Sequence, residues 1–190
     1  MVVQNSREAL GAMADGLRRA GERVGQLESE VQPVAQDGRL QPHEWIVTPD
    51  GKLLKTDATE HHLSHDLVGP QDIAWDVAGL EAEWELDSHE MRMVEAVIAR
   101  DAGRRFSPEL LDVYRVAYRA FRMGQLWMGA ENVGRSSSEG GRLESAAFRM
   151  RELLAAALER WSRRRGPRSG RHPGCDAHED ADGAEPTPPG

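Results

Sequence analysis

Acidic and histidine side chains gather in residues 53–79, between two apolar stretches of the chain. Carboxylate oxygens suit Mg²⁺, whereas imidazole combined with carboxylate suits Zn²⁺. His61 and His65 are four residues apart, a spacing that places two ligands on one face of a helix. The stretch could therefore be a metal site, a loop that handles phosphate, or a polar turn without chemistry.

A zinc site would need a third ligand, for which Asp57 and Asp66 are the candidates. The pattern H-E-x-x-H is absent, and the stretch has no clear helical pattern. We therefore favour the alternative that His61, His62 and His65 face solvent, or that one of them holds the Asp57 loop by hydrogen bonds.

A β-hairpin is predicted immediately before these residues. Two short apolar runs, 45–47 and 53–54, flank the sequence Pro-Asp-Gly at 49–51, which is a strong turn signal. A hairpin joins its two ends, so Glu44 and Asp57 should lie close together and could bind Mg²⁺. The alternatives are that Asp57 is a turn or cap residue and that Glu44 is an ordinary loop residue.

The remainder of the chain is predicted to be helical, because apolar residues recur at helical spacing. Ser107 followed by Pro108 predicts a helix start, and Ser88 is the expected cap of the preceding helix. The serine- and glycine-rich residues 134–141 are expected to form a flexible connection. Helices are predicted at residues 6–30, 71–86, 88–102, 106–130 and 140–164.

The fold class that follows is α+β and predominantly α, a helical bundle that carries one short β-hairpin. The chain divides into an N-terminal helical segment at 1–34, a body at 35–165 and a tail at 166–190. The tail is rich in Pro, Gly and acidic residues, so we expect it to be disordered. The aromatic residues Trp75, Tyr114, Tyr118 and Phe121 are expected in the core and not in a ligand site.

Composition excludes several classes of protein. The net charge of −8 argues against nucleic-acid binding and against an anionic membrane surface, and no apolar run approaches the roughly 18 residues of a membrane span. Cys175 is the only cysteine, which excludes a disulfide within the chain and a zinc site built on cysteines. We expect a cytoplasmic protein. Arginine far outnumbers lysine, which suggests a GC-rich bacterial genome.

The order of the parts resembles the C-terminal lobe of the protein-kinase-like fold, and most closely the bacterial aminoglycoside phosphotransferase and choline-kinase group. Three segments carry the resemblance: "DGRLQPHEWIV", "LLKTDATEHH" and "QDIAWDVAG". The longer stretch "PHEWIVTPDGKLLKTDATEHH", together with "DLVGPQDIAWDVAG" after it, also looks like a set of uncharacterised bacterial proteins related to that group. The resemblance implies a kinase-like C-lobe, ATP with Mg²⁺ as cofactors and a small hydroxylated molecule as substrate.

The resemblance also assigns roles to single residues. Glu44 takes the place of a metal-binding Asn, and Asp57, thirteen residues later, takes the place of the second metal ligand. Arg39 replaces the catalytic Asp and cannot act as a base, so Asp37 is the remaining candidate for that role. Asp76 matches a carboxylate at the start of a helix that holds the backbone of the catalytic loop. A second candidate for this support is Asp72.

Two functions remain open at this stage. The first is a divergent phosphotransferase, or the C-terminal fragment of one, that is inactive as an isolated chain because neither a Gly-rich phosphate loop nor the partner Lys of a kinase N-lobe is found. Such a chain would need the missing N-terminal lobe or a partner chain. The second is a non-catalytic, pseudokinase-like binding domain. A metal-binding protein that uses His61 and His65 is a lesser alternative.

Overall fold

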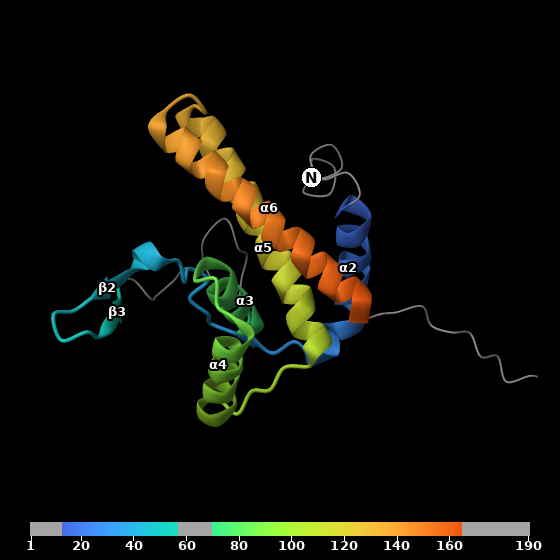
Figure 1. Ribbon diagram of the computed structural model, residues 1–190. Helices are drawn as coiled ribbons and strands as arrows, with labels where there is room; N and C mark the ends of the chain where they lie inside the picture. The colour runs from blue at the N-terminus through green and yellow to red at the C-terminus, as the bar shows by residue number, and fades with distance from the viewer. Residues whose placement is uncertain (1–12, 57–69, 165–190) are drawn as a thin grey trace, which may run out of the picture.

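The computed structural model describes residues 13–56 and 70–164, and this part of the chain is mostly helical (Figure 1). The α-helices are α2 (Met13–Leu27), α3 (Ala74–Glu83), α4 (Ser88–Asp101), α5 (Pro108–Val133) and α6 (Ser138–Arg164). Short 3-10 turns follow α2 at Glu28–Glu30 and precede the hairpin at Pro42–Glu44. The α+β, predominantly α class expected from the sequence is confirmed. The predicted tail at 166–190 lies outside the described residues.

The predicted hairpin is present. Strand β2 (Trp45–Val47) pairs antiparallel with β3 (Leu53–Lys55), and Gly51 in the turn has φ of 81°, a left-handed conformation that glycine adopts without strain. The structure adds a second antiparallel pair that the sequence did not predict, between β1 (Pro33–Val34) and β4 (Gln71–Asp72). Strands of two residues are too short to leave a recognisable pattern of alternating side chains.

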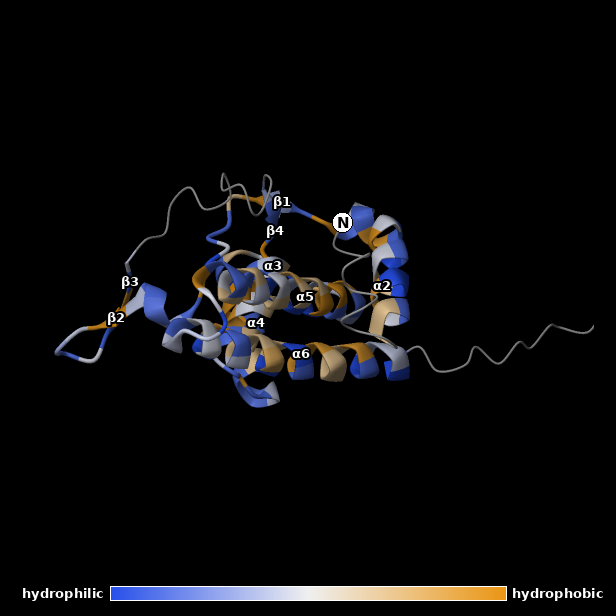
Figure 2. Ribbon diagram, turned by 90° about the horizontal axis from the view of Figure 1, so that it is seen from above, coloured by the Kyte–Doolittle hydropathy of each residue, from blue (hydrophilic) through white to orange (hydrophobic). Residues whose placement is uncertain are grey.

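Helices α5 and α6 form the body of the molecule. They lie side by side over most of their length (Figures 1 and 2), and each extends about 40 Å at the usual rise of an α-helix. Ser107 caps α5 as expected, because its hydroxyl accepts a hydrogen bond from the amide of Leu110 at 3.1 Å. In the described residues, no helix is both long and apolar enough to cross a membrane.

Three predicted helix starts were wrong. Helix α3 begins at Ala74, and Gln71–Asp72, which were predicted to open this helix, form β4 instead. Helix α4 is capped by Asp87 and not by Ser88: the Asp87 carboxylate accepts from the amides of His89 and Glu90. Helix α6 begins at Ser138, so much of the expected flexible connection at 134–141 is helical. The cap at Asp87 is part of a capping box, because the Glu90 side chain in turn accepts from the Asp87 amide at 2.8 Å.

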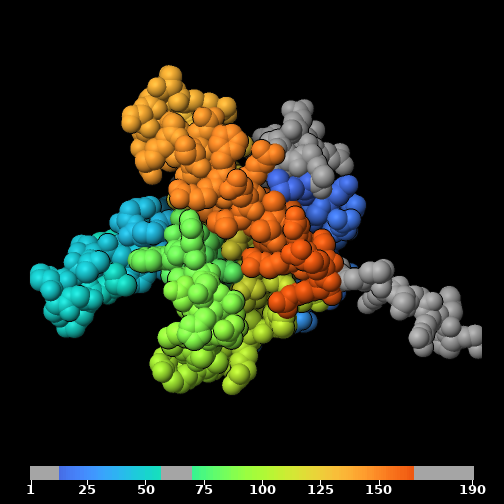
Figure 3. All heavy atoms as spheres, in the orientation of Figure 1, coloured from blue at the N-terminus to red at the C-terminus, as the bar shows by residue number. Residues whose placement is uncertain are grey.

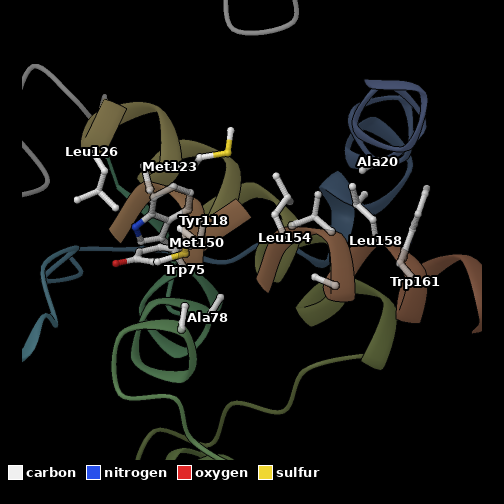
Figure 4. Packing of buried hydrophobic residues seen from close by; sticks show 14 residues of the cluster. Ala20, Trp75, Ala78, Tyr118, Met123, Leu126, Met150, Leu154, Leu158 and Trp161 are labelled. Carbon is white, nitrogen blue, oxygen red and sulfur yellow. The ribbon is translucent and has the colours of Figure 1, made fainter. Parts of the chain in front are cut away.

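The main core lies where α2 and α3 pack against the α5–α6 pair. Trp75, Tyr118 and Leu154 are buried there (Figure 4). The Trp75 ring meets the rings of Tyr118 and Phe121 edge-on, with centroids 5.3 and 5.4 Å away. The expectation that these aromatic residues are core residues is confirmed. Tyr114 packs against the same core and against two smaller apolar clusters.

Most residues of helix α3 are buried. Gly79 lets it approach α5 closely, because a Cβ atom at this position would lie 2.7 Å from the ring of Tyr118. This packing fixes the position of Asp76 in the first turn of α3, and Asp76 faces the segment before the hairpin.

Candidate functional site

The candidate site lies at the first turn of α3, where Asp76 meets the loop that precedes the hairpin. The carboxylate of Asp76 accepts hydrogen bonds from the backbone amides of Asp37 at 3.0 Å and of Gly38 at 2.9 Å. Gly38 has φ of 75°, so glycine suits the conformation that turns its amide toward Asp76. The contact expected of Asp76, between a helix carboxylate and the loop backbone, is therefore present.

Asp76 is a carboxyl group with a strongly perturbed protonation equilibrium. Burial raises its pKa to about 6, and the neighbouring charge of Asp37 acts in the same direction. The two amide hydrogen bonds and the ammonium group of Lys55 favour the ionised form and oppose that rise. The cost of desolvation therefore exceeds the stabilisation that the loop amides give.

We expect Asp76→Ala to lower the free energy of unfolding by about 1–3 kcal/mol at neutral pH, because it leaves two partly buried amides unpaired. The loss should grow as the pH falls from about 7.5 to about 4.5. Since the folded protein holds the proton of Asp76 up to a pKa of about 6, the favourable contribution of Asp76 is full below its unfolded pKa. The part that depends on the bound proton disappears as the pH rises through about 6, which leaves the contribution of the two amide hydrogen bonds at neutral pH. Urea unfolding of both proteins at several pH values measures the difference.

The difference between the two proteins isolates Asp76, because all other titrating groups are common to both. A loss that shrinks at acid pH would show that the amide hydrogen bonds outweigh burial and that the pKa is lowered.

Asp72, the second candidate for loop support, contacts other groups. Its carboxylate is fully buried and accepts from the amides of Gln32 at 2.8 Å and Ala74 at 2.9 Å, and from Nη2 of Arg104 at 2.6 Å. It thus joins the end of the α2 segment to the start of α3. Among the described carboxylates, the loop amides of Asp37 and Gly38 bind Asp76 and not Asp72.

Lys55, at the end of β3, places its ammonium group between the carboxylates of Asp37 and Glu44. Its Nζ lies 3.3 Å from Oδ2 of Asp37 and 3.6 Å from Oε2 of Glu44, and its side chain is only 11% exposed. The other oxygen of Asp37 accepts from the amide of Arg39 at 3.1 Å. The two carboxylates therefore share one cation that belongs to the chain itself, which the sequence did not predict.

The open end of the hairpin is closed by backbone contacts. Both the amide and the hydroxyl of Thr56 donate to the carbonyl of Glu44, at 2.9 and 3.0 Å. Glu44 and Thr56 are thus neighbours, as the hairpin prediction required. Asp57 follows Thr56 directly but lies outside the described residues, and so do His61, His62, His65 and Asp66. The distances from Glu44 to Asp57 and from His61 to His65 remain predictions.

Two further side chains hold the same loop, and the sequence did not indicate either. The indole Nε1 of Trp84 donates to the carbonyl of Leu40 at 2.7 Å, and the ring of Trp84 packs edge-on against Trp45 with centroids 6.2 Å apart. The buried Gln36 accepts from the amide of Gln71 at 2.9 Å. Neither contact has a local sequence signal, since each joins segments more than thirty residues apart.

A cavity of about 490 Å³ lies beside the loop, between residues 41–43 and helices α3, α5 and α6. Its polar wall includes Glu83 and Arg122, whose guanidinium Nε donates to the Glu83 carboxylate at 2.8 Å. Its apolar wall comes mainly from leucines of α5 and α6. A volume of this size accommodates a small molecule that combines polar and apolar groups.

Residues 13–56 and 70–164 contain no group of three or more His, Cys, Asp or Glu side chains that could hold a metal ion. Comparisons with family models, with curated proteins and with solved structures find no match to this chain. Inferences about function therefore depend on the geometry of the loop, the hairpin and α3.

Proposed function

We propose that this chain is a divergent, kinase-like lobe related to bacterial small-molecule phosphotransferases, which does not transfer phosphate as an isolated chain and acts in the cytoplasm. The observation that carries the proposal is the pair of hydrogen bonds from the Asp37 and Gly38 amides to Asp76. A loop that is anchored by a carboxylate on the following helix and leads into a hairpin is the arrangement that the resemblance implies. The cavity beside residues 41–43 offers space for a small hydroxylated substrate.

The loop has poor chemistry for phosphoryl transfer. Arg39, at the position of the catalytic base, is exposed and cannot accept a proton near neutral pH. Asp37 is the only other candidate that we assign, and both of its oxygens are engaged, one by Lys55 and one by the Arg39 amide. This is the reason for proposing that the isolated chain is inactive.

The cofactors implied by the resemblance are ATP and Mg²⁺, with Glu44 and Asp57 as the metal ligands. The described part of this site does not fit Mg²⁺, because the ammonium group of Lys55 already stands between Asp37 and Glu44. A divalent cation beside that ammonium group would meet electrostatic repulsion. We therefore derive no step of the chemistry through Mg²⁺.

A non-catalytic, pseudokinase-like binding domain is the second candidate function. Lys55 favours it, because an ammonium group that pairs with Asp37 and Glu44 stabilises the loop and the hairpin base without a bound cation. In this function the lobe presents its loop, hairpin and cavity to a ligand or partner, and no reaction follows.

Lys55→Met is expected to give the chain a response to Mg²⁺ that the unmutated chain lacks. The change removes the positive charge and keeps most of the side-chain volume, so Asp37 and Glu44 lose their shared cation. With Mg²⁺ at about ten times its dissociation constant, mass action adds about 1.4 kcal/mol of stability, or about 3–5 °C in Tm. Thermal unfolding with and without Mg²⁺ measures this shift.

Lys52→Met is the matched control, because Lys52 lies at the exposed hairpin tip and pairs with Asp50 at 2.7 Å. It should leave the chain unresponsive to Mg²⁺. A comparable Mg²⁺ response of the unmutated chain would contradict the exclusion of the cation by Lys55. Turnover of ATP by that chain, abolished by Asp57→Asn, would contradict the proposal that it is inactive. Stabilisation by Zn²⁺ that is lost in His61→Ala and His65→Ala would favour the histidine site instead.

A further inference from the structure

The β2–β3 hairpin exposes apolar side chains on both of its faces. It projects from the helical body as a separate arm (Figures 1 and 3), and hydropathy colours its strands as apolar (Figure 2). Side chains of the cross-strand pair Ile46 and Leu54 lie on one face, and those of Val47 and Leu53 lie on the other. All four are more than half exposed. An isolated pair of strands with this much exposed apolar surface is only marginally stable in water.

The outer edge of β2 has no strand partner among residues 13–56 and 70–164. The amide of Thr56 donates to the carbonyl of Glu44, and the amide of Thr48 donates to the carbonyl of Lys52. In β2, the even-numbered residues therefore direct their backbone hydrogen bonds toward β3, as Ile46 does toward Leu54. The amide and carbonyl groups of Trp45 and Val47 therefore point away from β3. Within the described part of the chain, β2 pairs with β3 alone.

This edge also lacks the features that usually prevent association. The strand sequence Trp-Ile-Val carries no charge, and the two lysines of the hairpin lie at the tip and at the base, where each pairs with a carboxylate. The hairpin contains two acidic and two basic residues at 44–56, so it is neutral in a chain with a net charge of −8. The hairpin itself therefore adds no net charge to the repulsion between two copies of this acidic protein.

We propose that the outer edge of β2 pairs antiparallel with the same edge of a second copy of this chain, about a two-fold axis through Ile46. In this register the amide and the carbonyl of Trp45 bond to the carbonyl and the amide of Val47 of the second copy. The two-fold axis generates the same two bonds between Val47 and Trp45 of the second copy. The two Ile46 side chains lie directly opposite each other. The two hairpins then form one continuous sheet, which has enough strands to be stable. The pairing requires neither nucleotide nor metal, so it is independent of the proposed function.

Sedimentation equilibrium of the full chain over a wide range of concentrations tests the pairing. We expect a reversible monomer–dimer equilibrium, because a two-fold contact is closed and does not propagate. Ile46→Lys should raise the dissociation constant by about tenfold or more, since it sets two like charges opposite each other. Val47→Pro should also weaken the dimer, because it removes an outward amide and spares the bonds to β3.

Met128→Lys is the matched control, because Met128 on α5 is 59% exposed, close to the 56% of Ile46. It should leave the dissociation constant unchanged. A chain that stays monomeric at every concentration would overturn the proposal and assign the hairpin to a different partner. Assemblies larger than a dimer, or equal dissociation constants for Ile46→Lys and Met128→Lys, would also overturn it.

Discussion

Replacing Asp72 by alanine is expected to lower the free energy of unfolding by about 3–5 kcal/mol, the range for a buried ion pair that loses one member. The Asp72 carboxylate is 0% exposed and accepts from two backbone amides and from Arg104. Without it, the amide of Ala74 loses its partner at the start of α3, and the guanidinium group of Arg104 keeps two backbone carbonyls and the ring of Phe106 but no carboxylate partner among the described residues. Urea unfolding followed by circular dichroism measures the loss.

Asp101→Ala is the control for this change, because Asp101 pairs with Arg100 in solvent at the end of α4. It should cost well under about 1 kcal/mol, as exposed ion pairs do. Asp72→Asn keeps an acceptor for one donor and should fall between the two variants. A cost of Asp72→Ala no larger than that of Asp101→Ala would contradict the role assigned to Asp72 in joining the α2 segment to α3.

Replacing Glu81 by glutamine is expected to cost about 3–5 kcal/mol as well, for a different reason. Its Oε2 lies 2.6 Å from Nε of Arg115 and 3.5 Å from Nη2 of Arg119, and both guanidinium groups are largely buried. Burial lowers the pKa of Arg119, and Glu81 is the main group that opposes this. Loss of the Glu81 charge leaves two buried cations with Asp112 as the remaining carboxylate.

A double-mutant cycle separates the ion pair from simple loss of packing. Arg119→Met in the Glu81→Gln background should recover part of the lost stability, because it removes one of the two unpaired charges. Glu22→Gln, which breaks an exposed pair with Arg18 on α2, is the control and should have little effect. Additive costs for Glu81→Gln and Arg119→Met would show that the two charges do not interact.

Much of the local structure could be predicted because its signals are local. The Pro-Asp-Gly turn specifies the hairpin, and Ser107 with Pro108 specifies the start of α5. The start of α6 was missed because glycines normally weaken a helix. Here Gly140 is required by packing, since a side chain on it would collide with the backbone of Gly134.

The candidate site was only partly predictable, because its contacts join distant segments. Asp76 was predicted to hold the loop because its position matches a carboxylate in the family that the sequence resembles. Its contact with the loop backbone is present in the structure. Lys55 was missed, although it is one of two lysines in the chain, because residue type alone does not reveal that it faces Asp37 and Glu44. Sequence reasoning placed Glu44 near a metal ion, and the structure places the ammonium group of Lys55 beside it.

The arrangement of α5 and α6 has a consequence for the order in which this protein folds. The two helices are neighbours both along the chain and in space, so they can associate after closing only a short loop. The bonds from Asp72 to Gln32 and from Asp76 to Asp37 join residues 40 and 39 positions apart, and each requires a larger loss of chain entropy. We therefore expect the α5–α6 pair to form early and the loop at Asp76 to close late. The same loop is then the first part of the body to open in native-state fluctuations.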